Sequence, residues 1–229
     1  MDDDEQPRIA ILGAGPIGLE AALYARYLGY PVALLEAESM PAANVFKLAG
    51  TNMEGCFAEL ASRLGVAALQ AQNPDWSCPA ASAMLTAAEY HEHYLLPLAQ
   101  SDLVADALFT NSKVLAVARP ESDAPWRIEI QNVVGVQTFY EAEIVIDATG
   151  QGSTELLGTR EEEPVSDAEA ESLCFQNPTA DFYVLGSKVV ELPGGFSFGV
   201  GLNQIRELFA ILGEREDLDL YATMRPIGE

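Results

Sequence analysis

The chain has 229 residues, of which 49% are hydrophobic, and this is enough for a sizeable core in one large domain or two small ones. Its 35 acidic residues against 12 basic ones give a formal net charge of −23, which would repel nucleic acid and an anionic membrane. The three cysteines form no Cys-x-x-Cys pair, and this speaks against a zinc ribbon, a dithiol redox centre and a disulfide framework.

The N-terminus gives no sign of a targeting segment. Residues 1–5 are acidic where a secretory signal would be basic, and the apolar stretch that follows is interrupted by glycines. No apolar run is long enough to span a bilayer. Together with the unpaired cysteines, these features predict a cytoplasmic protein.

The first predicted unit is a strand, a glycine turn and a helix. Residues 8–12 form a short apolar run typical of a buried parallel strand, and the sequence GAGPIG follows at once at 13–18. Apolar residues then recur at helical spacing as far as Leu28, and Gly29 with Pro31 predicts the end of the helix.

A second strand is predicted at 32–35, and it ends on Glu36. This acid follows Gly13 at close to the roughly 20 residues expected for a carboxylate that binds an adenosine ribose. In such a unit the first glycine makes the tight turn, the second lets the backbone approach a pyrophosphate, and the third lets the helix pack on the sheet. A turn that needs glycine only for its own geometry would not account for Glu36. The unit therefore predicts a site for the ADP half of a dinucleotide, and the carboxylate disfavours the 2′-phosphate of NADP.

The next segment, 39–82, reads as irregular, apart from a short helix over 56–64. The sequence Thr86-Ala-Ala-Glu89 is a capping box, which predicts a helix that starts at Thr86 and ends or kinks near Pro97. His91 and His93 on this helix point to different sides, so we expect surface or packing roles and no metal site.

Three β-rich runs, at 113–118, 126–130 and 136–140, predict an antiparallel meander. A continuous apolar strand then follows at 142–147 and closes on Asp147-Ala-Thr-Gly150. This turn is similar to a second glycine-ended strand at the ligand edge of a sheet, although a plain strand exit explains it equally well.

The last predicted elements are a strand at 182–185, which ends on Gly186-Ser187-Lys188, and a helix from about 202 to 212 that Gly213 terminates. We expect residues 1–213 to form a single domain that contains the meander. We expect the acidic residues 214–229 to be a mobile tail.

Taken in this order, the motifs resemble the two-dinucleotide-binding flavoprotein family, which comprises FAD-dependent pyridine nucleotide oxidoreductases similar to thioredoxin reductase, and flavin monooxygenases. Residues 86–99 are similar to the segment that these enzymes carry before the meander, and 182–188 with 203–208 are similar to their C-terminal flavin segment. The resemblance covers about residues 7–213. It implies an α/β fold, a Rossmann-like FAD-binding domain whose parallel sheet is accompanied by an antiparallel β-meander, and it implies FAD as the cofactor.

The resemblance also implies which residues bind the cofactor. The glycine turn would lie on the pyrophosphate, Glu36 and Ala37 on the adenosine, and the backbone of Val114 on the adenine. Gly186 and Ser187 would meet the ribityl and pyrophosphate end, while Gln204 and Ile205, at a helix N-terminus, would offer N–H groups to the flavin. The complete set implied is Gly13, Ala14, Gly15, Pro16, Ile17, Gly18, Glu36, Ala37, Val114, Thr149, Gly150, Gly186, Ser187, Gln204 and Ile205.

Two departures from the family bear on catalysis. Many relatives have an aspartate where this chain has Ser187, a neutral and weaker acceptor. Relatives also carry a second, NADPH-binding domain between the Ala-Thr-Gly strand and the last strand, where this chain has only the 30 residues 151–180. This connection is too short for a second dinucleotide site.

The sequence thus favours an FAD-binding flavoprotein, an oxidoreductase that takes electrons from a diffusible reductant or a partner protein, with no catalytic residue identified. Two alternatives stay open: a non-catalytic flavin- or nucleotide-binding module, shortened from a larger enzyme, and an NAD-dependent dehydrogenase. The substrate and the electron donor are not specified, and a homo-oligomer is compatible with the sequence.

Overall fold

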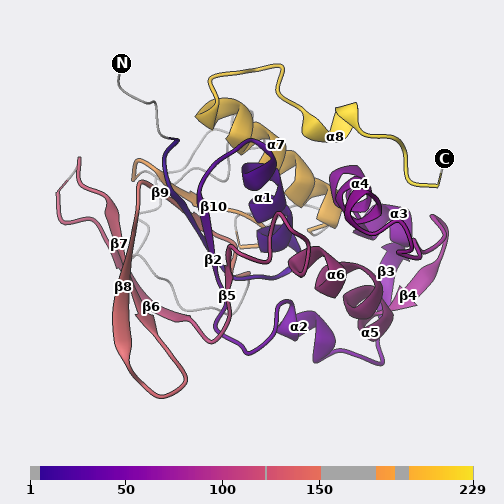
Figure 1. Ribbon diagram of the computed structural model, residues 1–229, viewed down its shortest axis with the longest axis horizontal. Coiled ribbons are helices and arrows are strands. Elements are labelled where there is room, and N and C mark those ends of the chain that lie inside the picture. Colours follow the sequence, from indigo (N-terminus) through magenta and orange to yellow (C-terminus); the bar gives the residue numbers. More distant parts are fainter. Residues whose placement is uncertain (1–5, 122, 151–178, 189–195, 229) are drawn as a thin grey trace.

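The computed structural model describes residues 6–121, 123–150, 179–188 and 196–228. Its centre is a parallel sheet (Figure 1). The strand order in this sheet is β10-β9-β1-β2-β5. The chain builds one side of this sheet, from β1 to β5, before it builds the other, from β9 to β10. The order therefore reverses between β1 and β9, the place where ligands bind in open α/β sheets. The strands are β1 (Ile9–Leu12), β2 (Val32–Leu35), β5 (Leu108–Phe109), β9 (Ile144–Asp147) and β10 (Phe182–Val184).

Both faces of the parallel sheet are covered, which explains why its strands are apolar throughout. Ile9 and Ile11 face the helices, and Ala10 and Leu12 face the meander. The meander consists of β6 (Lys113–Ala118), β7 (Trp126–Gln131) and β8 (Gln137–Ala142), paired antiparallel, and it lies on the opposite side of the sheet from the helices in Figure 1. The α/β fold with a parallel sheet and a β-meander is confirmed.

Two long helices, α1 (Pro16–Tyr27) and α7 (Phe198–Leu212), pack against each other on the helical face. The two helices approach so closely that a Cβ atom placed on Gly201 would lie 2.2 Å from Cδ1 of Ile17. The rings of Tyr24 and Phe209 stack with their centroids 5.2 Å apart. Helix α7 begins at Phe198, where Ser197 caps it, so the predicted start near residue 202 was wrong.

The expectation of an irregular segment between 39 and 82 was largely wrong. The predicted helix over 56–64 is divided, because Cys56 ends a strand and Ser62 starts a new helix with its side chain as the N-cap. The elements of this region are α2 (Ala43–Phe46), β3 (Asn52–Cys56), α3 (Phe57–Leu60), α4 (Arg63–Gln72) and, paired with β3, β4 (Met84–Thr86).

The helix that follows Thr86 is confirmed, together with its capping box. It runs as α5 (Ala87–Tyr90), a π-helical turn η1 (His91–Leu95) and α6 (Leu96–Ala99), so it changes pitch before Pro97 and continues past it. Proline has no N–H to offer the carbonyl four residues earlier. That carbonyl, on His93, accepts a hydrogen bond from the indole Nε1 of Trp76 at 3.1 Å.

The two histidines have the surface and packing roles expected of them. His91 is buried, with its Nε2 3.0 Å from the carbonyl oxygen of Pro41, whereas His93 is exposed. Within the described residues no group of side chains has the composition of a metal site.

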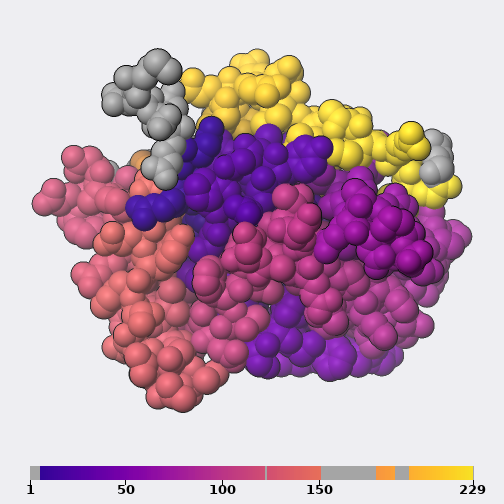
Figure 2. All heavy atoms as spheres, in the orientation of Figure 1, coloured from indigo at the N-terminus to yellow at the C-terminus, as the bar shows by residue number. Residues whose placement is uncertain are grey.

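Residues after Gly213 do not form the mobile tail that we expected. The short helix α8 (Leu220–Thr223) follows a buried Leu218, and the backbone N–H of Leu220 donates to the hydroxyl of Tyr24 at 3.1 Å. Figure 2 shows this segment, in yellow, lying across the surface of the helical layer. The division of the chain at residue 213 stays a prediction.

No helix in the described parts of the chain combines the length and the apolar character needed to cross a membrane.

Candidate functional site

The turn between β1 and α1 uses its three glycines in three ways. Gly13 has a φ of +91°, which a residue with a side chain rarely adopts. A Cβ atom on Gly18 would lie 1.9 Å from the carbonyl oxygen of Gly13, whereas a Cβ atom on Gly15 would meet nothing within 4 Å. The first glycine therefore makes the turn, the third permits close packing, and the second leaves open space at the start of α1.

Glu36 lies directly beside this turn and is only 9% exposed. One carboxylate oxygen accepts the backbone N–H of Ala14 at 2.8 Å, and the other accepts the N–H of Glu38 at 2.9 Å. These two hydrogen bonds fix the plane of the carboxylate before any ligand arrives. Each carboxylate oxygen can accept a further hydrogen bond, so the side chain can still bind hydroxyl groups.

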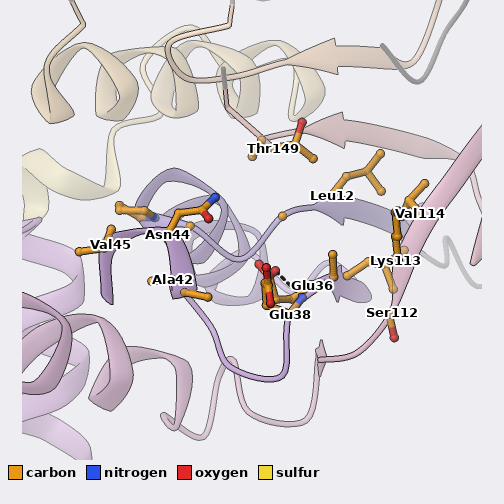
Figure 3. A pocket seen from close by; sticks show the side chains of 17 residues that line it. Leu12, Glu36, Glu38, Ala42, Asn44, Val45, Ser112, Lys113, Val114 and Thr149 are labelled. Carbon is orange, nitrogen blue, oxygen red and sulfur yellow. Dashed lines mark hydrogen bonds between the residues drawn. The ribbon is translucent and has the colours of Figure 1, made fainter. Parts of the chain in front are cut away.

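A cavity of about 310 Å³ opens above the glycine turn, within the range of small-ligand pockets (Figure 3). It is bounded by the turn, by the end of β2, by α2 and by the start of β6. The residues that line it are Leu12, Gly13, Gly15, Pro16, Leu35, Glu36, Ala37, Glu38, Ala42, Ala43, Asn44, Val45, Ser112, Lys113, Val114, Ala148 and Thr149.

Seven of the residues that the sequence assigned to the cofactor line this cavity. They come from four separate places in the chain, which the fold brings together: Gly13, Gly15, Pro16, Glu36, Ala37, Val114 and Thr149. Ala14, Ile17 and Gly18 do not line it, but they shape it. Ala14 holds Glu36, Ile17 packs against α7, and Gly18 lets α1 approach the turn.

The predicted residues nearer the C-terminus lie outside this cavity. The N–H of Gly186 donates to the side-chain Oε1 of Gln204 at 2.8 Å, so the loop after β10 is joined to α7. Because α7 starts at Phe198, Gln204 and Ile205 are buried in its second turn and not at its N-terminus. The expectation that their N–H groups are free at a helix start was wrong. The assignment of Gly150, Gly186, Ser187, Gln204 and Ile205 to a cofactor stays a prediction.

A second carboxylate lies at the same edge of the sheet, at the end of β9. One oxygen of Asp147 accepts both the N–H of Thr149 at 3.0 Å and its hydroxyl at 2.5 Å. The other oxygen accepts from the ammonium group of Lys188 at 2.8 Å, and this ammonium also lies 3.2 Å from the Thr149 hydroxyl. The exposed fractions of the Lys188 and Asp147 side chains are 18% and 4%, so the ion pair is largely buried.

Sequence reasoning missed several wall residues. Ser112 and Lys113 directly precede the predicted Val114, and their position at the start of a strand was a usable signal. Residues 42–45 gave no signal in the sequence, because α2 has only four residues and starts from Ala42 in the left-handed region at a φ of +50°. The N–H of Ala42 donates to the carbonyl of Ala14 at 2.8 Å, which ties this wall to the glycine turn.

Most of the connection 151–180 lies outside the described residues. The prediction that it lacks a second dinucleotide site stays a prediction.

No protein-family model matches the sequence, and no curated protein matches it. Solved structures do share the fold. The FAD-bound OTEMO structure (form 2) is 20% identical with a TM-score of 0.50, over 66% of this chain and 27% of that one. OTEMO in complex with FAD and NADP (form 2) is also 20% identical with a TM-score of 0.50, over 67% and 27% of the two chains. Bacillithiol disulfide reductase Bdr (YpdA) from Bacillus cereus is 15% identical with a TM-score of 0.47, over 63% and 40%.

The matched region thus covers about a quarter of the OTEMO chain. It covers about two thirds of the present chain, and this part has the fold found in OTEMO.

Proposed function

We propose that this chain binds FAD, with the ADP half in the cavity above the glycine turn, and that it acts as a flavoprotein oxidoreductase. The observation that carries the proposal is the open space at Gly15 beside the fixed carboxylate of Glu36. A pyrophosphate at the start of α1 would meet backbone N–H groups and the positive end of the helix, and the adenosine ribose would reach Glu36.

The fold supports FAD over other ligands of a Rossmann unit. Of two structures that share it at a TM-score of 0.50, one is described as FAD-bound and the other as a complex with FAD and NADP, so FAD is named in both. The β-meander on the second face of the sheet and the joined β10–α7 segment are the features that the sequence shares with flavoproteins. Bound FAD would supply hydride or single-electron transfer, and this chain would supply the binding and the orientation.

Two other functions are compatible with the same pocket. A flavin- or nucleotide-binding module without catalysis would use identical contacts, and an NAD-dependent dehydrogenase would use the glycine turn and Glu36. NAD is the weaker candidate because it leaves the meander and the β10–α7 segment without a role. A cytoplasmic location also belongs to this proposal, and the free thiols of Cys56 and Cys78 support a reducing environment.

The first test is the chromophore of the purified protein. We expect a flavin absorption spectrum, and chromatography of the released compound should identify FAD, because FMN lacks the ADP half that the pocket is shaped for. FMN, or NAD without flavin, would contradict the assignment. If the purified chain is colourless, titration of the apoprotein with FAD, FMN and NAD makes the same distinction.

Reduction of the bound flavin tests whether the chain itself holds a pyridine nucleotide. We expect dithionite to reduce the flavin at once and NADPH to reduce it slowly, without saturation, in stopped-flow measurements. Positioning two reactants can lower the activation barrier by roughly 7–11 kcal/mol, so reduction should be slow when no site positions the nicotinamide. A fast, saturable phase at micromolar NADPH would show that the chain holds a pyridine nucleotide site after all.

A further inference from the structure

Lys188 lies at the ligand edge of the sheet, next to the glycine turn. Asp147 ends β9 and is paired in register with Leu12 of β1 on one side and Val184 of β10 on the other. The residues that follow these three therefore emerge at the same edge. A Cβ atom on Gly13 would lie 3.0 Å from Cα of Thr149, and Thr149 is the residue that Lys188 contacts.

Thr149 connects the ion pair to the cavity. It lines the cavity together with Gly13 and Gly15, and Figure 3 places it across the pocket from Glu36 and Glu38. Its hydroxyl donates to Asp147, so the same oxygen accepts from Lys188. The ammonium group is thus one hydroxyl away from the wall above the start of α1.

The charges around the cavity favour a role for a cation beside Thr149. Glu36 and Glu38 contribute two carboxylates, and Glu38 is paired at 2.7 Å with the ammonium group of Lys47, outside the lining. Among the described lining residues the one cation is Lys113, which is exposed, so Glu36 has no cation beside it there. The whole chain carries a formal charge of −23. The start of α1 offers only about half a positive charge, whereas a dinucleotide pyrophosphate carries about two negative ones.

Lys188 can serve a phosphate without leaving Asp147 unpaired. An ammonium group has three N–H donors, and described residues engage two of them, through Asp147 and Thr149. Asp147 also keeps the N–H and the hydroxyl of Thr149 when the ammonium turns toward a ligand. The buried carboxylate therefore keeps the ammonium group near the cavity, and it retains its own hydrogen bonds when the ammonium group turns.

We propose that Lys188, held by Asp147 and Thr149 at the edge of β9, binds the pyrophosphate of the dinucleotide. This inference rests on the proposed function, since it assigns the phosphate contact within the same pocket. It adds a side-chain cation to the backbone N–H groups of the glycine turn, and it gives the pocket a preference for phosphorylated ligands over the bare nucleoside.

The test compares ADP with adenosine, because the two differ only in the phosphates. Their dissociation constants are measured by calorimetry for the wild-type chain, Lys188→Gln, Lys188→Arg and a charge-matched control, Arg215→Gln, whose side chain is exposed after α7. We expect Lys188→Gln to reduce the preference for ADP over adenosine about tenfold, the effect of losing one charged hydrogen bond. Lys188→Arg should retain most of the preference, and the control should retain all of it.

A merely structural role for Lys188 would weaken ADP and adenosine equally and leave the preference unchanged, and that result would overturn the proposal. If Lys188→Gln does not fold, because Asp147 is left buried without its partner, the double variant Asp147→Asn with Lys188→Gln removes both charges together. It should show the same loss of preference. If the wild-type chain binds neither FAD nor ADP, the proposed function itself fails; if it binds both and the preference survives in these variants, only the role of Lys188 fails.

Discussion

Two buried carboxylates show how differently this chain treats acids at the edge of the sheet and in the helical layer. Glu36, at the ligand edge, has a backbone N–H on each oxygen. Glu20, inside α1, is fully buried; one oxygen accepts the hydroxyl of Tyr94 at 2.5 Å, and the other has no hydrogen-bond partner among the described residues. Burial raises the pKa of Glu20 to about 7, and the Tyr94 and Ser62 hydroxyls oppose the rise.

The difference reflects what surrounds each side chain. A strand end and the following turn present N–H groups that no other residue uses, so an acid there is held by the backbone. A helix interior has no free N–H groups, so Glu20 depends on the hydroxyls of neighbouring elements. The carboxylate at the edge of the sheet thus has a backbone donor on each oxygen, whereas the carboxyl group in the helical layer has one oxygen without a hydrogen-bond partner among the described residues.

The largest effect that we expect concerns two glycines of the same turn. In Gly18→Ala the new methyl group would meet the carbonyl of Gly13, and we expect the free energy of unfolding to fall by about 3 kcal/mol, more than the roughly 1 kcal/mol that alanine contributes in a helix. In Gly15→Ala the methyl group meets open space, so stability should change by less than about 0.5 kcal/mol while FAD binding is lost. Denaturant unfolding and flavin titration of both variants test this. Equal stability losses would contradict the roles assigned to the two positions.

The second prediction uses the raised pKa of Glu20. The folded chain keeps this acid protonated below about pH 7, and the unfolded chain releases its proton near pH 4.5. Its stabilising contribution is therefore complete below the unfolded value and is lost as the pH rises toward 7. Between pH 5 and pH 8, the free energy of unfolding of Glu20→Gln should rise relative to wild type by about 2–3 kcal/mol.

The matched control is Glu121→Gln, which makes the same substitution at an exposed position. Its difference from wild type should not vary over that range. A Glu20→Gln curve parallel to the wild-type curve would show that Glu20 ionises in the folded chain as it does in the unfolded one.

These regions also differ in how well the sequence predicts them. The strands of the parallel sheet are continuous apolar runs because both faces are covered, and Glu36 follows from the spacing of a Rossmann unit. The start of α7 could not be predicted from the sequence, because Gly199 and Gly201 have low helix propensity. Packing overrides that propensity, since only a glycine at 201 leaves room for Ile17.

Long-range pairings explain the other failures. Nothing local in the sequence indicates that Lys188 meets Asp147, because the contact depends on β10 lying beside β9. The local sequence also does not indicate that the acidic C-terminal segment packs on the helical layer. This packing depends on Leu218 and Tyr221, two apolar positions in charged surroundings, which pack against the core that contains residues of α1 and α7.

The third prediction concerns the acid at the ligand edge. Glu36→Arg replaces the proposed ribose acceptor with a cation, and we expect FAD binding to weaken by about 1.5–3 kcal/mol, the scale of a charged hydrogen bond. Glu121→Arg makes the same change of charge at an exposed position and should leave the affinity unaltered. Flavin occupancy that is equal in both variants would remove Glu36 from the site.

The smallest effect should come from an acid in a third setting, the opposite edge of the parallel sheet. Glu143 precedes β9 and accepts from the guanidinium of Arg8 at 2.7 and 3.1 Å and from its backbone N–H at 2.8 Å. These hydrogen bonds hold the pKa of Glu143 below its usual value, so its contribution is present above the unfolded pKa and is lost as the pH falls, the opposite sign to Glu20. Because both side chains are 40% or more exposed, we expect Glu143→Gln to cost less than about 1 kcal/mol at neutral pH, and less still in high salt. Denaturant unfolding at pH 7 and at pH 3, with and without added salt, measures this: a loss that is unchanged at pH 3 would mean that Glu143 acts through packing and not through its charge.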